Sequence, residues 1–144
     1  MYRKKSIEYP FMEDTLRFQK KISRRFDPII PVILKNPNTN EETKFTHNFL
    51  VDTGASISIL TSSYKEFVKK MKPIDFLEIR YGAGTIRKVP IYEIIFIIKG
   101  IETKSIVAYD DKAHSLLLGI YGFLDKFAYN LLDHSSKKIK LYKY

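Results

Sequence analysis

The sequence of 144 residues contains no cysteine and no tryptophan. Without cysteine, disulfide bonds and thiolate-bound metal sites are excluded, and a reducing compartment is permitted. We expect a cytoplasmic protein. The most apolar stretch, residues 91–98, contains Glu93 and is far shorter than the roughly 20 residues of a membrane-spanning helix. The first residues, 1–5, lead into no apolar segment of the kind that a signal peptide has, so we expect no membrane association.

Acidic residues are scarce relative to basic ones: 16 Asp and Glu stand against 25 Lys and Arg, which gives a net charge of +9. Such an excess can indicate a nucleic-acid partner. The basic residues are spread along the whole chain, however, so nucleic-acid binding is the less favoured interpretation. Hydrophobic residues at 44% and charged residues at 28% indicate one globular domain that can bury a real core.

Patterns for several common kinds of site are missing. The three histidines, His47, His114 and His134, are not spaced as metal ligands are. No Ser-His-Asp arrangement or phosphate-binding loop is present. We therefore expect neither a metal nor a cofactor.

The apolar pattern predicts an all-β fold with one or two short helices. Runs rich in β-branched residues are bounded by turn residues such as those at 36–40. The predicted strands cover residues 27–35, 43–51, 57–60, 76–81, 90–99, 101–109, 115–119, 128–132 and 137–142.

A helix is predicted after residues 61–63. Ser63 and Glu66 have the spacing of a capping box, and Pro73 ends the helix. One apolar face has helical spacing. Its members are Tyr64, Phe67, Val68 and Met71. A second, short helix is predicted over residues 122–127.

Residues 1–27 form an N-terminal extension whose structure the sequence does not define. Residues 6–11 favour a short strand, and Pro10 places that strand at a sheet edge. Residues 15–25 show weak helical periodicity. We interpret the extension as a solvated segment packed on the domain. An arm for a partner or substrate is the alternative, and cleavage of this segment by the chain itself is a further hypothesis.

One motif carries most of the chemical information. The apolar run Phe49-Leu50-Val51 leads directly into Asp52, and Thr53-Gly54-Ala55-Ser56 follow. This pattern is typical of a buried strand that ends at a carboxylate, with a glycine that permits a tight turn. Because a carboxylate beside a buried strand is costly, the motif indicates either a turn that closes a strand or a functional acid.

A second motif, Leu116-Leu117-Leu118-Gly119, follows about sixty residues later and precedes Gly122-Phe123-Leu124-Asp125-Lys126-Phe127. Between the two motifs lies a predicted hairpin with Gly82-Ala83-Gly84 at its tip. In this order the motifs resemble the retropepsin-like aspartic proteases, the single-domain relatives of retroviral proteases, with the prokaryotic and cellular members nearest. The resemblance covers residues 28–144, which we take as the protease domain.

The resemblance implies a closed retropepsin-like barrel that is active as a C2 homodimer, with Asp52 of each chain as the catalytic residue. Thr53, Gly54, Ala55 and Ser56 would complete the active-site loop. Tyr81, Gly82, Ala83 and Gly84 would form the flap that closes on substrate. Leu118 and Gly119 would support the loop from beneath, and the terminal strands would contribute to the dimer sheet. Ile120 and Tyr121 follow Gly119 where retroviral members carry an arginine.

The chemistry favours the same arrangement. A single carboxylate cannot both activate water and protonate a leaving amine, whereas two neighbouring carboxylates that share a proton can. The chain has one Asp-Thr-Gly, so such a site requires two copies. We predict an aspartic endopeptidase whose partners are its own second copy and a peptide or protein substrate. The alternatives are a catalytically silent, protease-like dimeric binding module and a basic nucleic-acid-associated protein.

Overall fold

The structure, a computed structural model, describes residues 6–18, 21–80, 84–127 and 129–142. In these residues the chain is mostly β, with one short α-helix and two short 3₁₀ segments. The elements in chain order are β1 (Ser6–Pro10), β2 (Met12–Phe18), β3 (Lys21–Asp27), β4 (Ile29–Lys35), β5 (His47–Val51), β6 (Ser58–Leu60), a 3₁₀ segment (Ser62–Tyr64), α1 (Lys65–Lys69), β7 (Asp75–Arg80), β8 (Ile86–Ile98), β9 (Ile101–Tyr109), β10 (Leu117–Leu118), a 3₁₀ segment (Leu124–Lys126), β11 (Tyr129–Asp133) and β12 (Lys138–Tyr142). None of the helical segments described is long and apolar enough to cross a membrane.

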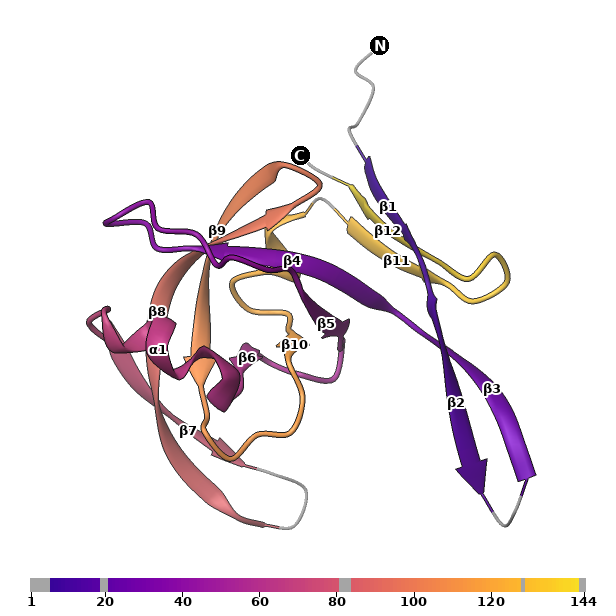
Figure 1. Ribbon diagram of the computed structural model, residues 1–144, viewed down its shortest axis with the longest axis horizontal. Helices are drawn as coiled ribbons and strands as arrows, with labels where there is room; N and C mark the ends of the chain where they lie inside the picture. Colours follow the sequence, from indigo (N-terminus) through magenta and orange to yellow (C-terminus); the bar gives the residue numbers. More distant parts are fainter. Residues whose placement is uncertain (1–5, 19–20, 81–83, 128, 143–144) are drawn as a thin grey trace.

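Six strands form a closed barrel in the order β4-β5-β10-β6-β9-β8 (Figure 1). The barrel closes because β8, 13 residues long, pairs with β9 along most of its length and also with β4. Two of the pairings, β5 with β10 and β6 with β9, are parallel. Strand β7 pairs with the first part of β8 and extends the sheet beyond the barrel. The predicted closed, all-β barrel is confirmed.

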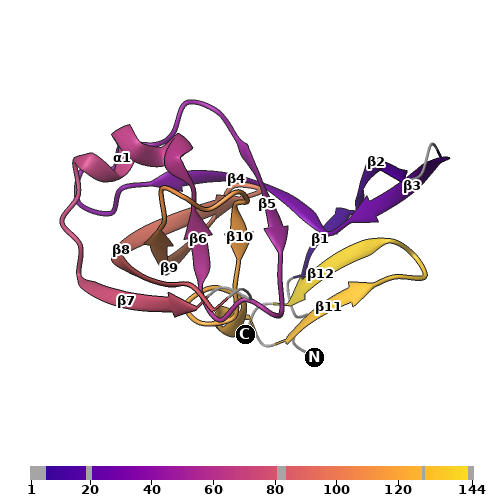
Figure 2. The ribbon, with the colours of Figure 1, turned by 90° about the horizontal axis from the view of Figure 1, so that it is seen from below.

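Two smaller β-structures lie beside the barrel. Strands β1, β12 and β11 form an antiparallel sheet in which the first and last strands of the described chain are neighbours. Strands β2 and β3 pair only with each other among the described strands, and this hairpin projects away from the barrel in both views (Figures 1 and 2). As predicted, Pro10 ends an edge strand.

The core explains why these segments are strands. Alternate side chains of β4 and β8 are buried, so one face of each strand points into the barrel. The terminal sheet contributes Ile7, Ile139 and Leu141 to the same core. A second, smaller cluster lies between β6, β8 and β9 and is covered by side chains of β7 and β10. Its buried members are Ile57, Ile59, Val89, Ile91 and Ala108.

Residues 15–25, where the sequence shows only weak helical periodicity, belong to the hairpin of β2 and β3. The backbone of β2 pairs with that of β3 from Met12–Asp27 to Phe18–Lys21. Only Phe11 separates β1 from β2, and only Pro28 separates β3 from β4, so the extended course of the flanking strands continues into the hairpin. Pro28 also disfavours a helical conformation at the residue before it. Weak periodicity over eleven residues does not outweigh these constraints.

The helix begins differently from the prediction. Residues Ser62–Tyr64 form a 3₁₀ turn, α1 starts only at Lys65, and the expected capping box is absent. Ser63 shares a hydrogen bond with the hydroxyl of Thr61, 2.8 Å away, and does not cap the helix. The apolar face is confirmed, because Tyr64 and Val68 are buried. Two predicted strands are shorter in the structure: 43–51 is reduced to β5, and 115–119 to β10.

Candidate active site

Asp52 directly follows β5, and its position is fixed by backbone and side-chain hydrogen bonds. Its N–H donates to the carbonyl oxygen of Leu118 at 3.0 Å, and its carbonyl accepts the N–H of Ala55 at 3.1 Å. The Oδ1 atom accepts the N–H of Gly54 at 2.9 Å. The carboxylate therefore lies on the inside of a tight loop, with one oxygen hydrogen-bonded to the turn that it begins.

The loop is also attached to the segment that follows β10. Ile120 donates its N–H to the carbonyl of Ala55 at 3.0 Å, and Tyr121 donates to that of Ser56 at 2.8 Å. A parallel bridge joins Ile57 to Tyr121. These contacts connect the two sequence motifs, although about sixty residues separate them.

Gly119 supports the loop through its lack of a side chain. Its N–H donates to Ser58 Oγ at 2.9 Å, in a buried position. A Cβ at residue 119 would lie 2.4 Å from the carbonyl carbon of Ile57, which is closer than real Cβ contacts come. Leu118, beside it, is completely buried. The backbones of Gly119 and Ile57 therefore pack in direct contact, and the supporting role of Leu118 and Gly119 stays a prediction.

The predicted loop residues lie together at the surface of the single chain. Asp52 and Ala55 are half-buried, whereas Thr53, Gly54 and Ser56 are exposed. An exposed carboxylate loop leaves room for a second molecule to approach it.

The predicted flap belongs to the hairpin of β7 and β8, which are paired up to Arg80 and Ile86. Gly84 is exposed and has φ +79°, a conformation that favours glycine. Tyr81, Gly82 and Ala83 lie outside the described residues. The structure thus places one of the four predicted flap residues.

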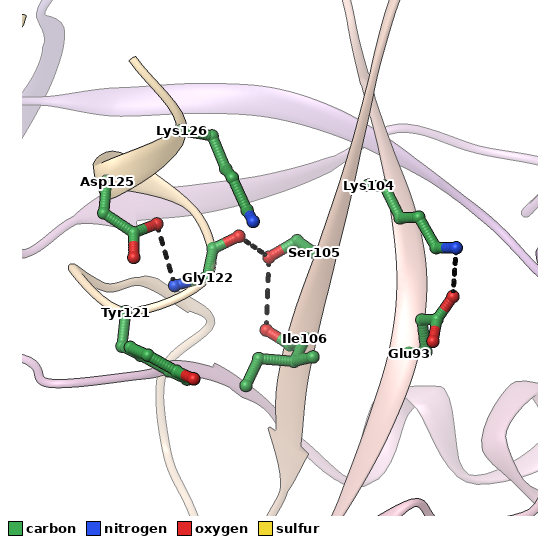
Figure 3. A pocket seen from close by; sticks show the side chains of 8 residues that line it. All are labelled: Glu93, Lys104, Ser105, Ile106, Tyr121, Gly122, Asp125 and Lys126. Carbon is green, nitrogen blue, oxygen red and sulfur yellow. Dashed lines mark hydrogen bonds and ion pairs between the residues drawn. The ribbon is translucent and has the colours of Figure 1, made fainter. Parts of the chain in front are cut away.

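A cavity of about 250 Å³, shown in Figure 3, has no residue of the Asp52 loop in its lining. Most of its polar side chains are already paired. Ser105 Oγ donates to the carbonyl of Gly122, Asp125 Oδ1 accepts the N–H of Gly122 at 3.0 Å, and Lys104 forms a 2.6 Å ion pair with Glu93 (Figure 3). This pairing leaves no convergent acid, base or nucleophile, so the cavity is not the candidate active site. In the described part of the chain, no three His, Asp or Glu side chains gather as metal ligands would.

Sequence reasoning missed a second acid beside the barrel. Asp110 has a side chain only 1% exposed, and its Oδ2 atom lies 3.0 Å from Arg87 Nη2. Its Oδ1 atom accepts the N–H of Lys112 at 3.0 Å. The signal was the one that marked Asp52, because Asp110 directly follows the apolar end of β9, residues 106–109. The segment that begins at Asp110 reads in the sequence only as a polar connection.

Comparison with known proteins tests the fold. No protein-family model matches the sequence, and no curated protein matches it. Among solved structures, a retropepsin-like aspartic protease from Rickettsia conorii superposes with a TM-score of 0.57 at 19% sequence identity, over 99% of this chain and 96% of that one. This chain has the retropepsin fold.

A second retropepsin, the EIAV protease in complex with the inhibitor HBY-793, superposes with a TM-score of 0.50 at 22% identity. It covers 65% of this chain and 82% of its own. The bacterial retropepsin-like protein also matches the terminal and projecting strands, whereas the EIAV enzyme matches a smaller part. At these identities the likeness establishes the fold and does not by itself establish an activity.

Proposed function

We propose that this chain is an aspartic endopeptidase that works as a C2 homodimer, with Asp52 of each copy forming the catalytic pair. The observation that carries the proposal is the position of Asp52. It begins a tight, exposed loop that is hydrogen-bonded to Leu118 and packed on Gly119, within a retropepsin fold. Turn residues elsewhere in the chain, such as Asn36 and Asp133, make the same contact from Oδ1 to the N–H two residues on, so the proposal depends on the attachment of the Asp52 loop to Leu118 and on the retropepsin fold.

The chemistry requires two such carboxylates. In the proposed dimer, the ionised Asp52 of one chain takes a proton from water as the water attacks the scissile carbonyl. The protonated Asp52 of the other chain donates a hydrogen bond to that carbonyl oxygen, and a proton then passes to the leaving amine. In this mechanism the two carboxylates share one proton. Thr53 and Gly54 complete the loop and lie at the surface where two copies would meet.

We also propose that the enzyme acts in the cytoplasm.

The first test is cleavage of a diverse peptide mixture, followed by mass spectrometry from mildly acidic to neutral conditions, about pH 4 to 7. Wild type is expected to cleave, and Asp52→Asn is expected to lose cleavage while remaining folded. Asp75→Asn is the matched control, because it makes the same chemical change at an exposed carboxylate on β7. Cleavage by Asp52→Asn at the wild-type rate would refute the proposed role, and binding of peptides without cleavage by a folded wild-type dimer would favour a binding module.

A mixing experiment tests whether the site is shared between chains. When wild type and Asp52→Asn are refolded together in equal amounts, random pairing places half of the wild-type chains in mixed dimers. Activity per wild-type chain should then fall to about half if each dimer needs both carboxylates. Unchanged activity per wild-type chain would show that one chain carries a complete site.

A further inference from the structure

A cavity of about 390 Å³ lies between the start of β8 and the segment that leads into β10. Its floor is apolar, and its rim carries cationic and hydroxyl side chains. The lining residues are Ile59, Thr85, Arg87, Lys112, Ala113, His114, Ser115 and Leu117. No sequence motif assigns a function to any of them.

The floor of this cavity adjoins the strand that anchors Asp52. Leu117 pairs with Ile59 on one side and with Leu50 of β5 on the other. The next residue, Leu118, provides the carbonyl that accepts the N–H of Asp52. Leu50 stands two residues before Asp52 in the chain, so the cavity adjoins the strand that leads into the Asp52 loop.

The charges around the cavity favour an anion. Arg87 and Lys112 are cationic, and no Asp or Glu is among the lining residues. The buried Asp110 lies behind them, ion-paired to Arg87 and hydrogen-bonded to the backbone of Lys112. Asp110 neutralises Arg87 and joins β8 to the segment after β9, and the exposed Asp111 does not line the cavity, so the lining itself keeps one unneutralised cation, Lys112. Lys112 itself is exposed.

We infer that this cavity selects peptide substrates that carry an Asp or Glu side chain beside the cleaved bond, and this inference rests on the proposed function. A carboxylate entering the cavity is attracted by Lys112 and Arg87. The hydroxyl groups of Thr85 and Ser115 can donate hydrogen bonds to the same carboxylate. An Asn or Gln side chain has nearly the same volume but lacks the charge. The expected preference for the acid is about fivefold, because a partly exposed ion pair is worth up to about 1 kcal/mol.

The test uses pairs of peptides that differ only by Glu against Gln, or Asp against Asn, next to the cleaved bond. Cleavage efficiency, kcat/KM, is measured for wild type, Lys112→Glu and Lys44→Glu. The control residue Lys44 is exposed in the connection between β4 and β5 and does not line the cavity, and its substitution changes the net charge equally. Lys112→Glu should abolish or reverse the preference for the acid, and Lys44→Glu should leave it within about twofold. In wild type the preference should also decline as salt is raised from about 0.05 to 0.5 M.

A binding measurement separates failure of this inference from failure of the proposed function. The same peptide pairs are titrated against Asp52→Asn, which keeps the cavity and removes the catalytic acid. Cleavage by wild type without a preference for the acid, or an equal effect of Lys112→Glu and Lys44→Glu, overturns the inference and leaves the protease intact. Preferential binding of acidic peptides without cleavage by wild type supports the cavity and overturns the protease. Absence of both cleavage and peptide binding overturns both.

Discussion

Substituting Gly119 by alanine tests the contact that supports the Asp52 loop. The added Cβ would lie 2.4 Å from the carbonyl carbon and 2.6 Å from the carbonyl oxygen of Ile57. Ordinary contacts begin near 3.4 Å, so the two backbones must separate by about 1 Å. The obstacle is backbone, and hydrogen bonds hold both segments, so no side-chain rotation relieves it.

The expected cost follows from this geometry. Overpacking of a core site typically costs about 1–3 kcal/mol, and a clash with fixed backbone belongs at the upper end of that range. We expect Gly119→Ala to lower the free energy of unfolding by about 3 kcal/mol and, for a chain of this length, Tm by about 10 °C. Because the displaced atoms belong to Ile57, which directly follows the Asp52 loop, peptide cleavage should fall further than the folded fraction does.

Urea unfolding followed by far-UV circular dichroism measures the effect, since the chain has no tryptophan for fluorescence. Gly100→Ala is the matched control. Gly100 has φ +73°, and a Cβ added there would have no atom within 4 Å, so alanine meets only backbone strain, about 1 kcal/mol. The reasoning is refuted if Gly119→Ala proves no less stable than Gly100→Ala.

Two further substitutions test the packing and the pH dependence. Phe123 is fully buried with its ring 5.2 Å from that of Phe96, so Phe123→Ala should cost about 3–5 kcal/mol in urea unfolding, whereas Phe45→Ala, at a residue 76% exposed, should cost almost nothing. Hydrogen bonds, above all from Ser136, lower the pKa of Asp133, so its ionised form stabilises the fold above the unfolded pKa of about 3.9 and that contribution is lost as pH falls through the lowered folded pKa. The stability difference between wild type and Asp133→Asn should therefore be largest near neutral pH and shrink below about pH 4; a difference that grows with acidity would contradict this assignment.

Much of the barrel could be predicted from local pattern. The alternation in β4 and β8, and the apolar runs that end at Asp52 and Gly119, are signals that each segment carries in its own residues. The hairpin over residues 12–27 could not be read in this way, because its course is set by the strands on either side of it. Residues 15–25 alone have too weak a period to distinguish helix from strand.

The cavity of about 390 Å³ that Arg87 and Lys112 line could not be predicted from the sequence. Arg87 and Lys112 are 25 positions apart in the sequence, and neither stands in a recognisable motif. They meet because β8 passes beside the segment after β9, and because Asp110 binds both. Asp110 itself was detectable, since a carboxylate directly after an apolar strand requires a partner. Which partner it finds depends on the closure of the barrel.

The sheet of β1, β12 and β11 has a kinetic consequence. Its pairings are made within one chain, and they bury Ile7, Ile139 and Leu141 against the core of the same chain. Folding of the protomer is then a unimolecular reaction whose rate does not depend on protein concentration. In the proposed dimer, association of the two copies would be a later, second-order step between bodies that are already folded. Dilution would therefore slow the appearance of dimers without slowing the appearance of native structure.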